Sequence, residues 1–178
     1  MSNTNNFIFK ALYVIAWLIF VGLSIEAGGL IVNFVFSLYK PEFVPNLYQK
    51  LDLSAMYNRS QWAFFGMYTF ILAIAILKAY LFYVVIMLVG KLDLAKPFNA
   101  DVSRKIMRIS YLALDIGVLG LVARQAAKNL LHHGYETDKL NQFWVDGEAF
   151  ILMAAVVYII AQIFKKGIEL QNENDLTI

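Results

Sequence analysis

Long apolar blocks, separated by short polar segments, dominate the pattern of hydrophobic and polar positions along the chain. The blocks predict helices at about residues 8–38, 62–90, 106–131 and 143–171, the last of them apolar as far as about residue 164. An α-helix needs roughly 20 mainly apolar residues to cross a hydrocarbon core of about 30 Å. The blocks lack the alternation that is typical of strands. The pattern therefore predicts an all-α fold, an integral membrane four-transmembrane-helix bundle in a single domain, residues 1–178.

The segments between the blocks differ in character. Residues 39–61 contain two prolines, and residues 46–53 within them are expected to form a short interfacial helix. Residues 91–105 form a compact basic turn, and residues 132–142 form a polar loop. No internal repeat and no low-complexity linker interrupts this layout, which agrees with one domain.

Two features at the block ends bear on how the chain meets the membrane. Trp62 and Trp144 begin the second and fourth blocks, where an aromatic belt at the membrane interface would place them. The first block follows Lys10 and in this respect resembles a secretory signal peptide. Its apolar stretch is too long for a signal sequence, and no clear A-x-A cleavage site closes it. We interpret it as a retained helix.

Composition then limits the chemistry. Hydrophobic residues make up 60% of the 178 positions, well above the share in soluble domains. The net charge of +2 argues against direct nucleic-acid binding, and the absence of cysteine excludes disulfides and thiolate metal sites. The two histidines, His132 and His133, are adjacent and cannot hold a haem between facing helices. We predict no metal, no cofactor and no enzymatic activity; a lipid-modifying enzyme is disfavoured because a nucleophile constellation is missing.

The distribution of Lys and Arg predicts the orientation in the membrane. Eight cations lie on the side of the termini and the basic turn: Lys10, Lys91, Lys96, Arg104, Lys105, Arg108, Lys165 and Lys166. Four lie on the other side: Lys40, Lys50, Arg59 and Lys139. Because cytoplasmic segments carry the excess of positive charge, we expect both termini in the cytoplasm and the loops 39–61 and 132–142 outside.

Four ionisable residues fall within the apolar blocks: Glu26, Lys78, Asp115 and Arg124. Each costs about 2–3 kcal/mol or more near the membrane centre unless it is paired or hydrated. Glu26 and Arg124 share their helix faces with glycines, which let membrane helices approach closely. We therefore predict a Glu26–Arg124 pair across a close contact of the first and third helices, with Glu148 as a second candidate partner of Arg124.

Lys78 and Asp115 lie at similar predicted depths and are expected to form a second pair. Asp115 comes nine residues before Arg124, so the two point in about opposite directions from one helix. One of them must face another helix, a partner subunit or a water-filled crevice. The charges either fix the order of the helices or form an ion pathway. We favour the first interpretation, because no substrate-shaped set of polar residues accompanies them.

Local signals mark both ends of the third helix. Asn99 or Asp101 can cap its start, and Gly134 is a natural stop behind the histidine pair. We interpret the histidines as helix-end residues rather than a metal site or pH sensor. The nearby acidic residues are interpreted as a solvated surface rather than a cation site: Glu136, Asp138, Asp146 and Glu148.

Two stretches carry a resemblance to a known family. They are residues 96–109, KPFNADVSRKIMRI, and residues 161–178, AQIFKKGIELQNENDLTI. With four spans, they resemble the YoaS-like family of small bacterial membrane proteins, a domain of unknown function; Asp101 stands where that family usually has asparagine. The resemblance implies the bacterial cytoplasmic membrane and no catalytic residues. Relatives are often encoded beside a small helix-turn-helix regulator, which implies a sensory or regulatory pairing.

The tail ends in apolar residues that are unfavourable in water. We expect it to fold back on the basic turn and form a platform for a partner protein: Pro97, Phe98, Arg104, Asp175 and Leu176. The leading hypothesis is a non-enzymatic sensor, regulator or accessory subunit that contacts the lipid bilayer and binds a partner through this platform. The alternative is a small transporter or ion-conducting subunit that uses the intramembrane charges. Homo-oligomerisation stays open.

Overall fold

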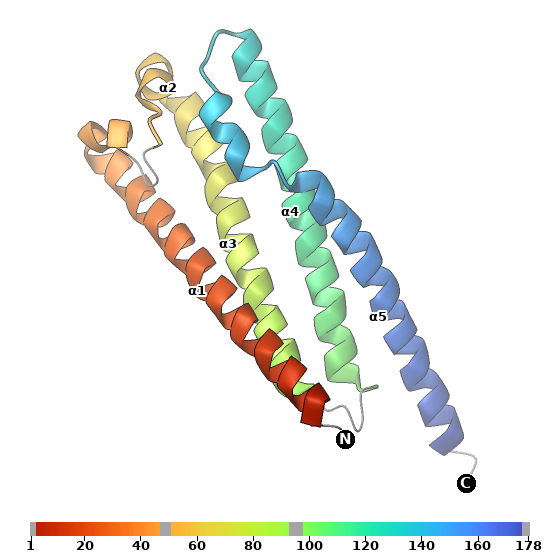
Figure 1. Ribbon diagram of the computed structural model, residues 1–178. Helices are drawn as coiled ribbons and strands as arrows, with labels where there is room; N and C mark the ends of the chain where they lie inside the picture. The colour runs from red at the N-terminus through yellow and green to blue at the C-terminus, as the bar shows by residue number, and fades with distance from the viewer. Residues whose placement is uncertain (1–2, 47–50, 93–97, 176–178) are drawn as a thin grey trace.

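The computed structural model of the protein describes residues 3–46, 51–92 and 98–175. Within these ranges the chain is almost entirely helical and contains no strand. The long helices are α1 (Asn3–Tyr39), α3 (Gln61–Lys91), α4 (Ala100–His132) and α5 (Gly147–Asp175). Four helices, the last taken with the segment before it, are long and apolar enough to cross a membrane (Figure 1). The prediction of an all-α, four-span membrane protein is confirmed.

The four long helices lie side by side in chain order, with both ends of the chain at the end of the molecule where α3 ends and α4 begins (Figure 1). We call this end the turn end. Helix α1 packs on α3, α3 on α4, and α4 on α5. Among the described residues, no extensive contact joins α1 to α4 or α5. Of the four long helices, α3 and α4 therefore each pack against two others, whereas α1 and α5 each pack against one.

The predicted close contact between the first and third spans is wrong, because α1 packs on α3. Helix α1 is apolar all round, so its sequence does not distinguish the face that packs against protein from the face that meets lipid. A Cβ atom added at Gly22 or Gly28 would meet nothing within 4 Å. The buried positions of α1 are Ala16, Ala27, Leu30 and Ser37.

Aromatic side chains join α1 and α3 at the end opposite the turn. There the rings of Phe34 and Tyr68 lie 5.4 Å apart, and those of Phe64 and Tyr68 lie 5.6 Å apart. The Tyr68 hydroxyl is buried and donates to the Leu30 carbonyl at 3.2 Å. Since Tyr68 has its polar atom satisfied inside an aromatic cluster, it joins the two helices with both packing and a hydrogen bond.

Small residues bring α4 and α5 together. A Cβ atom at Gly117 would lie 2.5 Å from Ile151 Cγ1 and 2.9 Å from the Gly147 carbonyl oxygen, so the backbones touch at this crossing. One helical turn further on, Gly120 lies against Gly147 in the same way. The Ser110 hydroxyl adds a buried hydrogen bond to the Ala154 carbonyl at 2.9 Å. The glycines of the predicted third span thus do allow a close approach, but to α5.

Two short helices, η1 (Pro41–Asn46) and α2 (Ser54–Arg59), follow α1. The interfacial helix predicted for residues 46–53 lies partly outside the described residues, and residues 51–53 precede α2 rather than forming a helix. Asp52 accepts hydrogen bonds from the hydroxyl and the amide of Ser54 at the start of α2. These bonds hold the pKa of the Asp52 carboxyl below its ordinary value.

Helix α4 ends as the sequence predicts. Gly134 has a φ of +77°, a conformation that favours glycine, and its amide bonds to the Leu131 carbonyl. The amide of Tyr135 bonds to the Leu130 carbonyl, which completes a Schellman motif. The guanidinium of Arg59 donates to the carbonyls at 133 and 134 and lies 4.4 Å from the centroid of the Tyr135 ring. This arginine therefore ties α2 to the end of α4.

The chain then turns back along α3 and α4 before the last helix begins. The 3₁₀-helix η3 (Asp138–Phe143) leads to Gly147, where α5 starts beside Gly117 and Gly120. About 12 residues of α4, or about 18 Å, lie beyond that level. The part of the fourth span beyond that level is therefore formed by η3 and residues 144–146, and Figure 1 shows η3 in blue between α3 and α4.

Candidate functional site

Arg124 binds the start of α5. Its Nη1 donates to Glu148 Oε1 at 2.6 Å, and its Nη2 donates to the carbonyls of Trp144 and Val145 at 3.3 Å each. The predicted Glu26–Arg124 pair is wrong, because α1 packs on α3 and does not bring Glu26 to this side of α4. Glu148, the second candidate partner, is the one that the structure shows.

The environment of Arg124 explains why a charge is present there. Backbone that leaves the helical ladder within a membrane needs other hydrogen-bond partners. The carbonyls of Trp144 and Val145 lie in such a stretch. The arginine donates to both, and the Trp144 carbonyl also accepts from the Gly147 amide. Glu148 lies in the first turn of α5, where a carboxylate also complements the helix dipole. This group of contacts holds residues 138–146, which we call the return segment, against α4.

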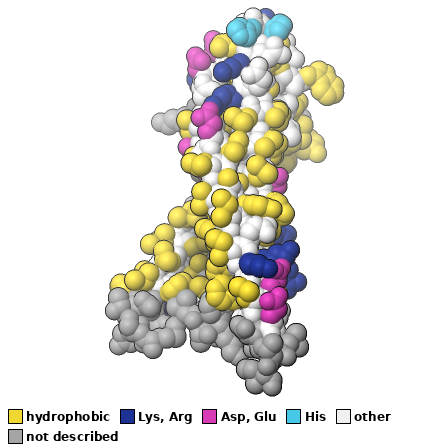
Figure 2. Space-filling model, turned by 90° about the vertical axis from the view of Figure 1, so that its right-hand side faces the viewer, with side chains coloured by type: hydrophobic (Ala, Val, Ile, Leu, Met, Phe, Trp, Pro, Cys, Tyr) yellow, Lys and Arg dark blue, Asp and Glu magenta, His cyan; other side chains and the backbone are white. Residues whose placement is uncertain are grey.

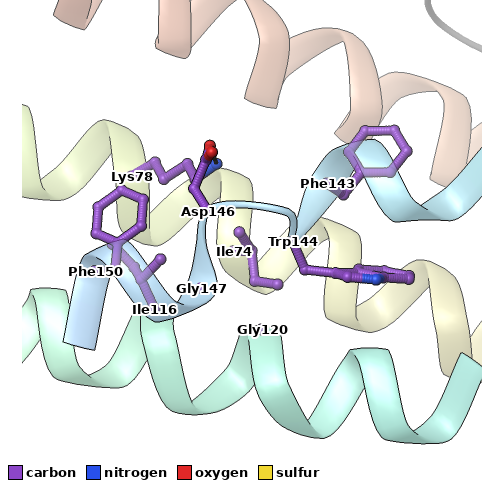
Figure 3. A pocket seen from close by; sticks show the side chains of 9 residues that line it. All are labelled: Ile74, Lys78, Ile116, Gly120, Phe143, Trp144, Asp146, Gly147 and Phe150. Atoms are coloured by element: carbon purple, nitrogen blue, oxygen red, sulfur yellow. Dashed lines mark ion pairs between the residues drawn. The ribbon is translucent and has the colours of Figure 1, made fainter. Parts of the chain in front are cut away.

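Lys78 lies near the middle of α3 and points at the residue before α5 (Figure 3). Its ammonium is 3.8 Å from Asp146 Oδ2 and 5.5 Å from the centroid of the Phe150 ring. The predicted Lys78–Asp115 pair is wrong. Asp115 lies on the open face of α4 among exposed apolar residues, and it forms no ion pair with any described residue. Asp115 and Arg124 do leave α4 on different sides, as their spacing predicts.

Glu26 faces a small cavity between α1, α3 and η3. The cavity measures about 40 Å³, and its polar lining comes from Glu26, Lys78 and Gln142. That volume is sufficient for a water molecule. Glu26 has no ion pair among the described residues. Lys78 is the cation that lines the same cavity. Lys78 thus lies between the side chains of α1 and the start of α5.

Trp144 corrects another prediction. Only 2% of this side chain is exposed, and its indole Nε1 has no hydrogen-bond partner among the described residues. Figure 3 shows the ring turned away from Lys78, between the helices. The aromatic-belt interpretation is wrong for Trp144, because the return segment carries it inward. Trp62, at the start of α3, is 89% exposed, as a belt residue would be.

The turn end contains part of the predicted platform. The rings of Phe98 and Phe164 lie 5.3 Å apart, and Phe98 Cδ1 lies 2.7 Å from where a Cβ at Gly167 would be. Arg104 is well exposed and lies 3.8 Å from Asp101 Oδ1. Pro97, Leu176 and the side chain of Asp175 lie outside the described residues.

The expected fold-back of the tail is not what the structure shows for residues 172–175. Helix α5 continues to Asp175 without a turn. The contact with the turn comes instead from Phe98, whose ring fits over Gly167 because that residue has no side chain. Sequence inspection missed Gly167, although a glycine within an otherwise regular helix is a signal of close packing.

The acidic residues near the return segment do not gather at one point. Asp146 and Glu148 bind Lys78 and Arg124, respectively. Within the described part of the chain, no three His, Asp or Glu side chains come close enough to hold a metal ion. His133 Nδ1 lies 2.8 Å from the Asn129 carbonyl, a contact within the end of α4.

Comparison with known proteins gives a family and no function. No curated protein and no solved structure matches the chain. A family signature described as a protein of unknown function, DUF2975, matches residues 37–178. The match includes α3, α4, α5 and both of their ion pairs, whereas Glu26 lies before it. The YoaS-like resemblance is therefore supported as far as an uncharacterised family, and the chain belongs to the DUF2975 family of proteins of unknown function.

Proposed function

We propose that this protein is a non-enzymatic, multi-pass membrane protein that binds a partner protein through its turn end, as a sensor, regulator or accessory subunit. The observation that carries the proposal is the contact of Phe98 with Phe164 and Gly167. This contact fixes the position of α5 at the point where the helix becomes polar. From Lys165 to Asp175 the helix extends for about 15 Å more.

The extension offers a surface of mixed character. Its exposed residues include Lys165, Lys166, Glu169 and the apolar Leu170, which is 52% exposed. In Figure 2 hydrophobic side chains cover the middle of the molecule, and charged side chains gather towards both ends. Leu170 and its charged neighbours form the surface through which we propose that the partner binds. The excess of Lys and Arg supports a cytoplasmic location for this end.

The intramembrane pairs support a structural role more than a transport pathway. Arg124 already has a carboxylate and two carbonyls as partners, and Lys78 has Asp146. Around Lys78 and Asp146 the helices pack without a cavity that would hold a substrate. Charges within a membrane cost less free energy when they are paired, so these pairs do not require an ion pathway to explain them.

Site-specific photocrosslinking in intact membranes tests this proposal. A photoreactive residue at Leu170 is expected to give one discrete protein adduct, whereas one at Lys139, on the opposite loop, is not. Phe98→Ala should weaken the Leu170 adduct because it releases α5. Phe7→Ala is the matched control, since Phe7 is an exposed aromatic residue at the same end. Adducts with lipid alone at Leu170, or an adduct unaffected by Phe98→Ala, would contradict the proposal.

A second candidate function, ion coupling, is favoured by one observation. Glu26 faces a cavity that it shares with Lys78 and has no ion pair among the described residues. An unpaired carboxyl within a membrane commonly marks an ion or proton pathway. If this protein moves protons, Glu26→Gln should abolish proton flux in proteoliposomes while the protein stays folded. Unchanged flux, or no flux in the wild type, would exclude this function.

A further inference from the structure

A groove runs between α3 and α4 at the turn end. It measures about 380 Å³. One wall comes from α3 and is aromatic and apolar: Tyr80, Tyr83, Val84 and Met87. The other wall comes from α4 and is charged: Asp101, Arg104, Lys105 and Arg108. Lys91, at the end of α3, completes the lining. The groove therefore places a row of cations opposite an apolar surface.

The cations of the groove outnumber its carboxylates. Lys105 is paired with Asp101, and Arg104 lies 3.8 Å from the same carboxylate. Arg108 has the face of the Tyr80 ring at 5.2 Å but no carboxylate among the described residues. No ion pair of Lys91 with a described residue is present either. After Asp101 is taken by Lys105, three positive charges remain for a ligand.

The position of Arg108 makes this excess costly without a ligand. It lies about 12 Å further along α4 than the start of that helix, beside residues of α3 that are otherwise apolar. A cation on a span is expensive unless it is paired or reaches a polar layer. An anion in the groove would satisfy Arg104 and Arg108, which lie one turn apart on the same side of α4.

We infer that this groove binds an anionic phospholipid, with its headgroup phosphate between Lys91, Arg104 and Arg108 and an acyl chain along Tyr83, Val84 and Met87. A free phosphate would use only the basic wall and would leave the apolar wall uncovered. A phospholipid uses both, and basic pockets between spans on the cytoplasmic side are typical binding sites for anionic headgroups. Tyr83 is 43% exposed, so its ring is free to contact an acyl chain.

Lipid retention by the full-length protein tests the inference. The protein is purified from membranes, reconstituted into vesicles of phosphatidylcholine with about a fifth phosphatidylglycerol, and extracted for native mass spectrometry. We expect phosphatidylglycerol to be retained in excess over its share. Arg108→Gln should weaken retention about fivefold, the usual effect of one cation near an anionic surface. Arg104→Gln serves as the second variant, because substitution of this highly exposed side chain should leave folding unchanged.

Lys128→Gln is the matched control, since Lys128 is an exposed cation of α4 at the opposite end of the helix. It should leave retention unchanged. Equal retention of the two lipids, or equal losses in all three variants, would overturn the inference. Competition by inorganic phosphate alone would assign the basic wall to a soluble anion instead. If an acidic peptide displaces the lipid and binds equally well without it, the groove is a protein-binding site and the inference also fails.

Discussion

Arg124 and Lys78 show how single charges are used within the spans. Each reaches the short segment before α5, and each meets a carboxylate there: Glu148 for Arg124 and Asp146 for Lys78. Arg124 in addition donates to two backbone carbonyls that have left the helical pattern. Both acidic partners are more than half exposed, and exposed ion pairs contribute little to the free energy of unfolding. We therefore expect the hydrogen bonds of Arg124 to the two carbonyls to contribute more than the ion pairs do.

Arg124→Met tests this distribution of energy. The change removes the side-chain donor of the Val145 carbonyl and one of the two donors of the Trp144 carbonyl, which also accepts from the Gly147 amide, and is expected to destabilise the protein by about 1–3 kcal/mol. Glu148→Gln leaves those donors in place and should cost less than about 1 kcal/mol, since its carboxylate is largely exposed. Unfolding by a denaturing detergent, followed by circular dichroism, measures both.

Gln125→Met is the control for Arg124→Met, because the neighbouring side chain is exposed. It should be neutral. If Glu148→Gln proves as costly as Arg124→Met, the ion pair and not the carbonyl contacts holds the return segment.

At the scale of helices, glycines decide which neighbours touch. Gly117, Gly120 and Gly147 form the crossing of α4 and α5, whereas Gly22 and Gly28 of α1 have open space beside them. The same residue type thus has a packing role in one helix and none in the other. The difference depends on the neighbour that each glycine meets.

Gly117→Ala is expected to weaken the α4–α5 contact. Its Cβ would overlap Ile151 and the backbone of Gly147, and overpacking of this kind typically costs about 1–3 kcal/mol. Gly22→Ala adds the same methyl group where nothing lies within 4 Å and should cause no loss. Thermal denaturation in detergent compares the two. Equal effects would show that α4 and α5 are not packed as described.

The end of α5 provides a second prediction for an element. Its contact with the turn involves Phe164 and Gly167, well before the end of the helix. Removing residues 172–178 should therefore leave the melting temperature in detergent unchanged. Gly167→Leu should lower it, because the leucine side chain would displace the Phe98 ring. A large loss on truncation would instead favour the tail as part of the platform.

For the whole molecule, the order of the helices matches the order of the chain. Each connection is short or closed by local hydrogen bonds, and each helix packs on the one before it. Both chain ends lie at the turn end (Figure 1), where the excess of Lys and Arg predicts the cytoplasm. In this predicted orientation, the groove would face the cytoplasmic leaflet and the end of α5 would face the cytoplasm.

Thiol labelling tests this orientation directly, because the chain has no cysteine of its own. Lys139→Cys and Gln171→Cys place single thiols at exposed positions on opposite ends. In intact cells a membrane-impermeant maleimide should label the residue 139 variant at once and the residue 171 variant only after permeabilisation. The reverse pattern would invert the orientation and place the groove outside.

The sequence by itself determined the features that depend on local structure. Hydropathy located the four spans, because burial of a backbone in lipid requires long apolar helices. Asn99 and Asp101 are the two caps that the sequence predicts for α4, and the Asn99 side chain accepts from the Val102 amide at 2.9 Å. Gly134 was predicted to end that helix, because a left-handed residue favours glycine.

Only the tertiary structure decided which groups meet across helices. Lys78 pairs with Asp146 instead of Asp115, and Arg124 pairs with its second candidate, Glu148. Glu26 and Asp115 have no ion pair among the described residues. The physical reason is that lipid and protein neighbours are equally apolar, so a span such as α1 carries no pattern that marks its packed face. The position at which α5 starts could not be predicted from the sequence either. The segment before it is held by hydrogen bonds from Arg124 to carbonyls 20 and 21 positions away in the chain.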